Sequence, residues 1–260
     1  MTMELKRLFF GMEAMAPWPE EFPPGRILGE ADRHLTLAFL GNEDADRLLE
    51  MLPNFPKPPF ATGLAGIFDR PVFLPPRVRR TASWHLDLLE EKESFFHYQK
   101  RLAAWLKDAG FALKGKNEFL THVTIARKPF DEKTWKESFQ KRPVFLNSIH
   151  LYESSGKYKI LWSYPLPAPF DPIEHTADLA FRIRGKDLSQ IYLHAQLAMS
   201  FYFPQFIRYF DSDPVEDLDQ IVASLNAMIA KADRREGCPF KAVSFHGKVK
   251  EGEWEMIVDV

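Results

Sequence analysis

The chain has 260 residues, a length that fits two domains of modest size. Hydrophobic residues make up 45%, aromatic residues 14% and charged residues 27%, which is typical of a globular protein and excludes disorder of the whole chain. A formal net charge of −2 disfavours capture of long duplex nucleic acid by a broad electrostatic field, although it is compatible with a local basic patch.

The single cysteine, Cys238, has no partner for an internal disulfide. The N-terminal segment is interrupted by charge too soon for a signal peptide, and no apolar run has the length needed to cross a bilayer. We therefore expect a cytoplasmic protein that does not enter a membrane.

Up to residue 164 the predicted strands outnumber the helices, which indicates an α+β fold. Alternating apolar residues and turn residues predict strands over 7–12, 34–40, 62–74, 84–88, 122–127, 145–154 and 158–166. Helices are expected near 44–52, from Lys92 to a stop at Gly110, and near 132–140.

Four prolines between residues 163 and 172 forbid a continuous helix or a central strand, so we expect a linker over 165–172 that joins domains of residues 1–164 and 173–260. The second domain is predicted to begin with a strand over 175–185 and a helix capped by Asp187 or Ser189. A second helix within 213–237 has acidic residues at its start and basic residues at its end, and strands over 241–249 and 253–260 follow.

Two segments, HLTLAFLG (34–41) and THVTIARKPF (121–130), each contain His-x-Thr-x with apolar residues at the x positions. Because side chains alternate along a strand, His34 and Thr36 emerge on one face, and so do His122 and Thr124. If the two strands lie side by side or are related by a pseudo-twofold axis, two imidazoles face each other across a gap lined by two hydroxyls.

Such a pair of imidazoles suits a phosphodiester. Hydrolysis needs a base for the attacking water and an acid for the leaving oxygen, and histidine can serve as either near neutral pH. The threonine hydroxyls can donate to the non-bridging oxygens, so the chemistry requires no metal. A single histidine on a strand is most often a packing residue, but two matching units in similar apolar strands favour a functional interpretation.

Residues 5–165 resemble the 2H phosphoesterase superfamily, in particular the RNA 2′,3′-cyclic phosphodiesterases of its RNA-ligase-like branch. The resemblance is carried by RLFFGM (7–12), RHLTLAFLG (33–41) and THVTIARK (121–128). It implies a bilobal fold of two pseudo-symmetric α+β halves around a central cleft. It also implies that His34, Thr36, His122 and Thr124 open a 2′,3′-cyclic phosphate to a 2′-phosphomonoester. We assign activation of water to His122 and protonation of the 3′ oxygen to His34.

Four arginines are candidates for binding the substrate. Arg127 lies on the opposite face of an ideal strand from Thr124, so a phosphate contact needs a bend or a strand end there; otherwise it is an ordinary exposed cation. Arg77, Arg79 and Arg80 form a local basic run that can follow an RNA backbone or simply lie in a solvated loop.

The C-terminal part resembles archease, the small activator of the GTP-dependent tRNA-splicing ligase. The matching pieces are EHTAD (174–178), the turn into the first helix, KAVSFHG (241–247) and the terminal IVDV (257–260), whereas the middle of the archease fold is missing. The resemblance implies a small, shortened α+β domain that is linked to RNA ligation.

In archease, acidic residues at these two matched ends meet at a divalent cation such as calcium. The resemblance therefore implies a metal site at Asp178 and Asp259, with His175 as a weaker ligand. Each carboxylate alone can equally be a turn or terminal residue. His246 is either a core residue or a member of the site, and we expect His85, His97, His150 and His194 to be structural or on the surface.

Three functional hypotheses follow. The first is an RNA cyclic phosphodiesterase without a cofactor, fused to an archease-like module. The second is a non-catalytic accessory factor that holds RNA ends for the tRNA-splicing ligase. The third is a phosphodiesterase that acts on a small cyclic nucleotide or an ADP-ribose cyclic phosphate.

Overall fold

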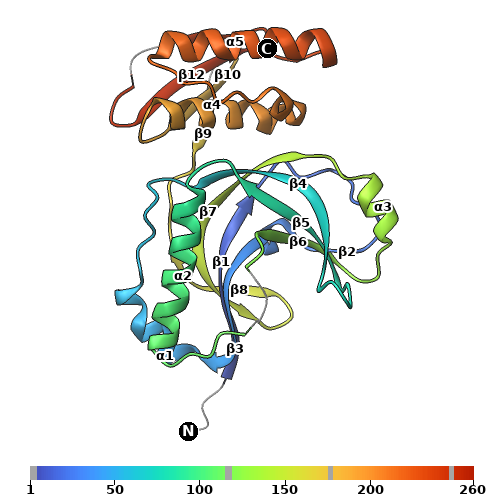
Figure 1. Cartoon of the computed structure of the whole chain (residues 1–260), viewed down its shortest axis with the longest axis vertical. Coiled ribbons are helices and arrows are strands. Elements are labelled where there is room, and N and C mark those ends of the chain that lie inside the picture. Colours follow the sequence, from blue (N-terminus) through green and yellow to red (C-terminus); the bar gives the residue numbers. More distant parts are fainter. Residues whose placement is uncertain (1–4, 115–118, 175–177, 246–248) are drawn as a thin grey trace.

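The protein is built from two β-sheets that each have their own hydrophobic core (Figure 1). The computed structural model describes residues 5–114, 119–174, 178–245 and 249–260. Within these ranges, no helix combines the length and the apolar character that a membrane crossing requires.

The first sheet closes on itself into a barrel-like core. Its strand order is β1-β3-β6-β5-β4-β7-β8, and β1 also pairs with β7, so that six strands form a ring with β8 outside it. The short strand β2 adds to β6, and every pairing is antiparallel. The strands are β1 (Leu5–Met15), β2 (Arg26–Ile27), β3 (His34–Asp44), β4 (Leu64–Leu74), β5 (Thr81–Leu88), β6 (His122–Arg127), β7 (Arg142–Ser154) and β8 (Tyr158–Tyr164).

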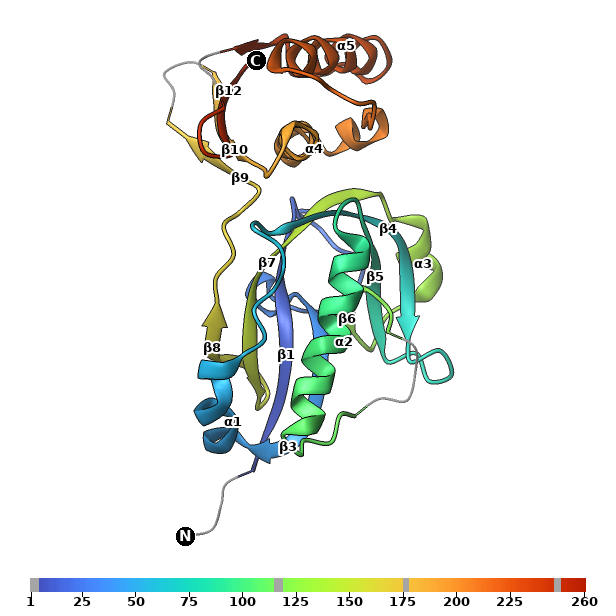
Figure 2. The same cartoon turned by 60° about the vertical axis from the view of Figure 1, so that its left-hand side comes forward.

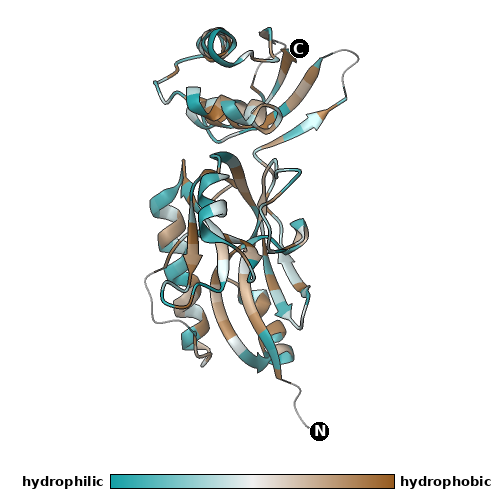
Figure 3. Ribbon diagram, turned by 90° about the vertical axis from the view of Figure 1, so that its right-hand side faces the viewer, coloured by the Kyte–Doolittle hydropathy of each residue, from teal (hydrophilic) through white to brown (hydrophobic). Residues whose placement is uncertain are grey.

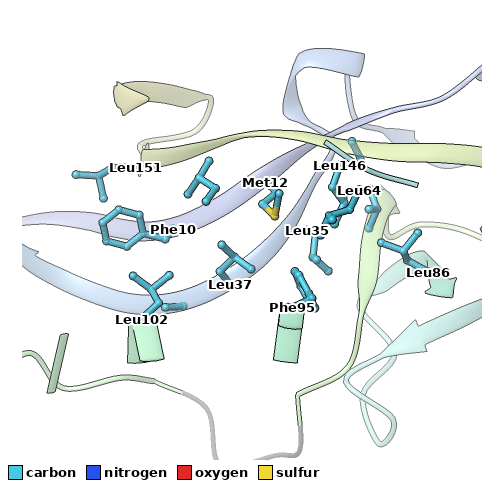
Figure 4. Packing of buried hydrophobic residues seen from close by; sticks show 14 of the residues in the cluster. Phe10, Met12, Leu35, Leu37, Leu64, Leu86, Phe95, Leu102, Leu146 and Leu151 are labelled. Carbon is cyan, nitrogen blue, oxygen red and sulfur yellow. The ribbon is translucent and has the colours of Figure 1, made fainter. Parts of the chain in front are cut away.

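Helix α2 (Lys92–Asp108) lies along this sheet and covers one of its faces (Figure 2). Its buried Phe95 and Leu102 lie beside Leu35 and Leu37 of β3 in the core (Figure 4). The helices α1 (Ala45–Met51) and α3 (Glu132–Glu137) are short, and each begins at an aspartate whose side chain accepts hydrogen bonds from backbone N–H groups of the first turn. The three predicted helices of this part are confirmed.

The second sheet has the order β11-β12-β10-β9, formed by β9 (Phe170–Ile173), β10 (Leu179–Arg184), β11 (Ala242–Phe245) and β12 (Glu253–Asp259). The helices α4 (Leu188–Tyr202) and α5 (Leu218–Glu236) begin at Asp187 and Asp217, which confirms Asp187 as the first cap. Figure 3 shows hydrophobic residues along the strands of both sheets and hydrophilic ones in most loops.

Strand β9 begins inside the proline-rich stretch that we expected to be a linker. Phe170 and Asp171 pair with Ile183 and Arg182 of β10. Pro172 is tolerated because β9 is an edge strand, where one missing backbone N–H donor costs little. The connection between the two sheets is therefore shorter than residues 165–172.

The two parts are packed against each other. Phe145 of β7 contacts the rings of Phe170 and Phe201, with ring centroids 5.7 and 5.4 Å apart, and it belongs to the core of the second part. A cavity of about 380 Å³ also lies at this junction, between Glu91 of the loop after β5 and Lys186 and Tyr192 at the start of α4.

A buried ion pair crosses the same junction. The carboxylate of Glu90 accepts hydrogen bonds from His194 Nε2 at 2.8 Å, from the backbone N–H of Ala65 at 2.8 Å and from Gln190 Nε2 at 2.5 Å. His194 Nδ1 donates to the carbonyl of Arg184. Burial would raise the pKa of Glu90, but these hydrogen bonds outweigh it and hold the pKa below its usual value. His194 is structural, as expected.

Candidate active site

The two His-x-Thr segments lie on neighbouring antiparallel strands. Leu35 of β3 pairs with Val123 of β6, which places His34 beside Thr124 and Thr36 beside His122. Leu35 and Val123 are fully buried in the core, so the four polar side chains leave the opposite side of the sheet. We call this side of β3, β6 and β5 the histidine face; it carries His34, Thr36, His122, Thr124, Ser83 and His85.

Both imidazoles are oriented in the same way by the backbone. Nδ1 of His34 lies 2.8 Å from the carbonyl oxygen of Asp32, and Nδ1 of His122 lies 2.8 Å from that of Leu120. A carbonyl only accepts, so Nδ1 carries the proton in both rings. Among the described residues, Nε2 of neither ring makes a hydrogen bond, and both are available to a substrate.

His34 lies in an aromatic setting. Its ring stacks on Phe9 at 4.7 Å, lies 5.1 Å from Tyr152 and meets Tyr158 edge-on at 5.0 Å. Gly11 makes room for it: a Cβ there would lie 3.1 Å from Cδ2 of His34 and 3.0 Å from the carbonyl oxygen of Leu35. The ring therefore has little freedom to move.

Both histidines are neutral in the free protein at neutral pH. The pKa of His34 is lowered to about 4, chiefly by burial; the hydrogen bond to Asp32 opposes this shift, and electrostatic interactions with His122, Arg127 and His150 add to it. Burial also lowers the pKa of His122, with a smaller contribution from His85. A phosphate anion between the rings would raise both pKa values, because it stabilises the protonated forms.

A line of hydroxyls runs from β6 into β5. The Thr124 Oγ1 lies 3.3 Å from the Ser83 Oγ, which lies 3.3 Å from the Thr81 Oγ1. Ser83 pairs directly with Thr124 and is buried. Sequence reasoning missed Ser83, although the alternation of TASWHLDL (81–88) already places Thr81, Ser83 and His85 on one face.

Arg127 shares the face of Thr124 because β6 contains a β-bulge. Ser83 pairs with Thr124 and Ala82 with Ala126, so Ile125 is an extra residue, and Ile125 and Ala126 are both buried. This is the bend that the strand pattern required for a phosphate contact. The guanidinium of Arg127 donates from Nη2 to the hydroxyl of Tyr158 at 2.8 Å.

The basic run lies in the turn between β4 and β5 and is exposed. Arg79 pairs with Glu132 at 2.9 Å, and the carbonyl of Arg80 accepts from the N–H of Lys128. Arg80 therefore lies next to the end of β6 that carries Arg127. Arg77 and Arg79 lie farther out in the turn, and His122 is at the other end of its strand.

Two further histidines lie near the paired motifs, His85 on the histidine face itself and His150 on β7. His85 pairs with His122 across β5 and β6, and its Nδ1 lies 2.7 Å from the carboxylate of Asp69. His150 is buried on β7 opposite Gly11 and bonds to Ser163 at 2.8 Å. Neither β5 nor β7 contains a His-x-Thr motif, so the sequence did not single out His85 or His150 as candidate site residues.

The predicted metal ligands lie at one end of the second sheet. Asp259 pairs with Ala242, and Asp178 directly precedes Leu179, which pairs with Val258. His175 and His246 lie outside the described residues. Within the described ranges, no group of three acidic, histidine or cysteine side chains is arranged to hold a metal ion.

Comparison with known proteins shows likeness only to solved structures. No family model and no curated protein matches the chain. E. coli LigT in apo form aligns with 21% identity over 63% of this chain and 99% of its own, with a TM-score of 0.46. A crystal structure of a phosphoesterase aligns with 21% identity over the same shares and a TM-score of 0.45. TT0787 of Thermus thermophilus aligns with 18% identity over 62% of this chain and 98% of its own, with a TM-score of 0.43.

Proposed function

We propose that the protein hydrolyses 2′,3′-cyclic phosphate at RNA ends to a 2′-phosphomonoester. The observation that carries the proposal is the arrangement of His34 and His122 on adjacent strands. Each ring is tied through Nδ1 to its own backbone and has Nε2 available. Two such imidazoles, each beside a threonine hydroxyl, match the two proton transfers of a phosphodiester hydrolysis.

In this mechanism Nε2 of His122 accepts a proton from water while the water oxygen attacks phosphorus. The bond from phosphorus to O3′ breaks, and protonated Nε2 of His34 gives its proton to O3′. The product is a 2′-phosphate beside a free 3′-hydroxyl, and the two rings have exchanged protonation states. Solvent returns the proton before the next turnover.

The remaining groups stabilise the charge that develops on the phosphoryl oxygens. The hydroxyls of Thr36 and Thr124 donate to the non-bridging oxygens, and Ser83 orients the hydroxyl of Thr124. Arg127 faces the same side of β6 and adds a positive charge. The bound anion also raises the pKa of His34, which supplies the protonated acid that the free protein lacks.

Product analysis tests this function. An RNA oligonucleotide that ends in a 2′,3′-cyclic phosphate is incubated with the protein, and ³¹P NMR distinguishes a 2′-phosphate from a 3′-phosphate. We expect the 2′-phosphate, and H34A and H122A should each lose roughly 10²- to 10⁴-fold in kcat. H97A is the matched control, because His97 is exposed on α2. Unchanged rates in either site variant would remove the mechanism.

The second part suggests an accessory role beside this activity. Asp178 and Asp259 lie at the same end of the second sheet, as the archease resemblance requires of a calcium site. We therefore also propose that this part binds a divalent cation and assists the GTP-dependent tRNA-splicing ligase. Calcium titration of the wild-type protein and D259N tests the first claim. Addition of the protein to the ligase tests the second, and no change in ligase guanylylation would contradict it.

A further inference from the structure

A row of side chains continues from His122 across two more strands. His122 of β6 pairs with His85 of β5, and His85 pairs with Arg70 of β4. Directly paired residues of antiparallel strands point to the same side of a sheet. His122, His85 and Arg70 therefore form one line on the histidine face, which extends away from His34.

Asp69 holds the outer two members of this row. It sits at a bulge of β4, between Phe68 and Arg70, and its carboxylate lies 2.7 Å from His85 Nδ1. The other carboxylate oxygen accepts from Arg70 Nη1 at 2.5 Å. One carboxylate faces an imidazole and a guanidinium, so the group has a net positive charge whenever His85 is protonated.

The two outer side chains remain accessible to a ligand. The side chain of Arg70 is 53% exposed and that of His85 is 14% exposed. Nδ1 of His85 is engaged by Asp69, whereas its Nε2 makes no hydrogen bond among the described residues. The arrangement therefore presents one ring nitrogen and one guanidinium beside the proposed reaction centre.

The other rows of the same three strands differ in chemistry. Thr124 pairs with Ser83 and Ser83 with Val72, while Arg127 pairs with Thr81 and Thr81 with Leu74. Both of these rows end in an apolar residue on β4. Of these three rows, only the one that begins at His122, the proposed base, ends in a positively charged residue on β4, which is Arg70.

The spacing of the row fits a chain of nucleotides. Neighbouring strands lie about 4.8 Å apart, so the backbone of Arg70 is roughly 10 Å from that of His122. The side chains of His85 and Arg70 lie along this span, so they can reach a phosphate that neighbours the one at His122. Single-stranded nucleic acid is commonly held by cations that follow its backbone.

We propose that His85 and Arg70 bind the internucleotide phosphate that precedes the terminal cyclic phosphate, which makes an RNA chain a better substrate than a mononucleotide. This inference rests on the proposed function and deepens it by naming the substrate class. The guanidinium of Arg70 donates to the non-bridging oxygens of that phosphate, as does Nε2 of His85 in its protonated form, and Asp69 positions both side chains.

Kinetics with two substrates test the inference. kcat/KM is measured for a nucleoside 2′,3′-cyclic phosphate and for a dinucleotide that ends in the same group. We expect R70A and H85Q each to reduce the preference for the dinucleotide about tenfold, because a charge-assisted contact is lost. R70K should keep most of the preference. R235A, which removes an exposed arginine of α5, is the charge-matched control.

Binding of products tests the same point without turnover. Isothermal titration compares a dinucleotide that ends in a 2′-phosphate with a nucleoside 2′-phosphate. The wild type should bind the dinucleotide about tenfold more tightly. Its log Kd should depend on log salt with a slope steeper by roughly 0.7, because one more phosphate is contacted. R70A should lose both differences.

The outcomes separate this inference from the proposed function. Absence of cyclic-phosphate turnover in the wild type contradicts the proposed function. The isothermal titration with products still shows whether His85 and Arg70 bind the additional phosphate. Equal affinities for the two products, or a preference that survives R70A, overturn the subsite. Loss of the preference in R77A but not in R70A would also overturn it, since the RNA would then follow the strand direction toward the basic turn.

Discussion

Leu35 of β3 and Val123 of β6 form a cross-strand pair in the core, and this pair sets the geometry of the histidine face on the other side of the sheet. A shift of one residue in this register would turn one histidine into the core. The placement of His34 and His122 therefore depends as much on two buried aliphatic side chains as on the polar residues themselves.

The maximum of kcat/KM is expected to lie at acidic pH. The mechanism needs neutral His122 and protonated His34, whereas the pKa of His34 is about 4 in the free protein and that of His122 is lowered. kcat/KM reports the free protein, so its alkaline decline should begin below pH 6.5, the ordinary histidine pKa, because both pKa values are lowered. The alkaline decline of kcat should occur at higher pH, because the bound anion raises the pKa of His34. Profiles from pH 4 to 9 check this, and a kcat/KM that rises between pH 6 and 8 would contradict it.

Stability should also report the buried imidazole of His34. Its folded pKa, about 4, lies below the unfolded value of 6.5, so the unfolded chain binds more protons between these pH values. The free energy of unfolding therefore falls as the pH is lowered through this window. From pH 7 to pH 5 we expect a loss of about 2 kcal/mol in the wild type that is absent in H34N. Urea denaturation at both pH values measures it, and equal losses in the two proteins would refute it.

Substitution of Gly11 should disturb His34 directly. A methyl group there would contact the His34 ring and the Leu35 carbonyl at about the closest distances found in proteins. G11A should lower kcat by about 10- to 100-fold and destabilise the fold by roughly 1–3 kcal/mol. G29A is the control, because Gly29 has a φ of −59° and a Cβ there would meet only an ordinary contact, 3.8 Å from a carboxylate oxygen of Asp32. Full activity of G11A would show that activity does not depend on the present position of the His34 ring.

Tyr158 should act through Arg127. Its hydroxyl accepts the only hydrogen bond that the Arg127 side chain makes among the described residues. Y158F should lower kcat/KM about three- to tenfold by releasing the guanidinium, and R127A should lower it by more. In the double variant the two losses should not add, because they remove one interaction. Y164F, on the same strand, is the control; additive losses would separate Tyr158 from Arg127.

The buried pair at the junction should contribute strongly to stability. H194L leaves the Glu90 carboxylate buried without its histidine partner, so the free energy of unfolding should fall by about 3–5 kcal/mol. K186M breaks the neighbouring pair of Lys186 with Glu91, where the lysine side chain is 56% exposed, and should cost less than about 1 kcal/mol. Chemical denaturation measures both. Similar costs for the two variants would mean that burial does not strengthen the pair.

The local elements of the fold follow closely from the sequence. The caps Asp187 and Asp217 and the stop at Gly237, where φ is 69°, mark helix ends through short-range hydrogen bonds and backbone geometry. The pairing of β3 with β6 was one of two arrangements that the repeated motif allowed. Strand β9 was missed because proline argues against a strand unless its position at a sheet edge is known.

The rest of the candidate site depends on contacts that a linear pattern does not contain. Arg127 reaches the histidine face through the extra residue Ile125, and a bulge of this kind becomes visible only against the partner strand. His85 has no motif around it, and its partner Asp69 lies 16 residues earlier on β4. Both cases depend on register, which no single segment specifies.

The tie between each imidazole and the carbonyl two residues before it has a consequence for how such a site can be assembled. A histidine that is oriented by its own strand needs no distant carboxylate to select its tautomer, so in the proposed mechanism each segment supplies one of the two proton-transfer groups by itself. When two such segments pair as neighbouring strands, as β3 and β6 do, their two imidazoles lie on the same face of the sheet. Under the proposed mechanism, two nearly identical short segments can therefore take opposite roles, since the difference between acid and base would come from the surroundings of each ring and not from the segment.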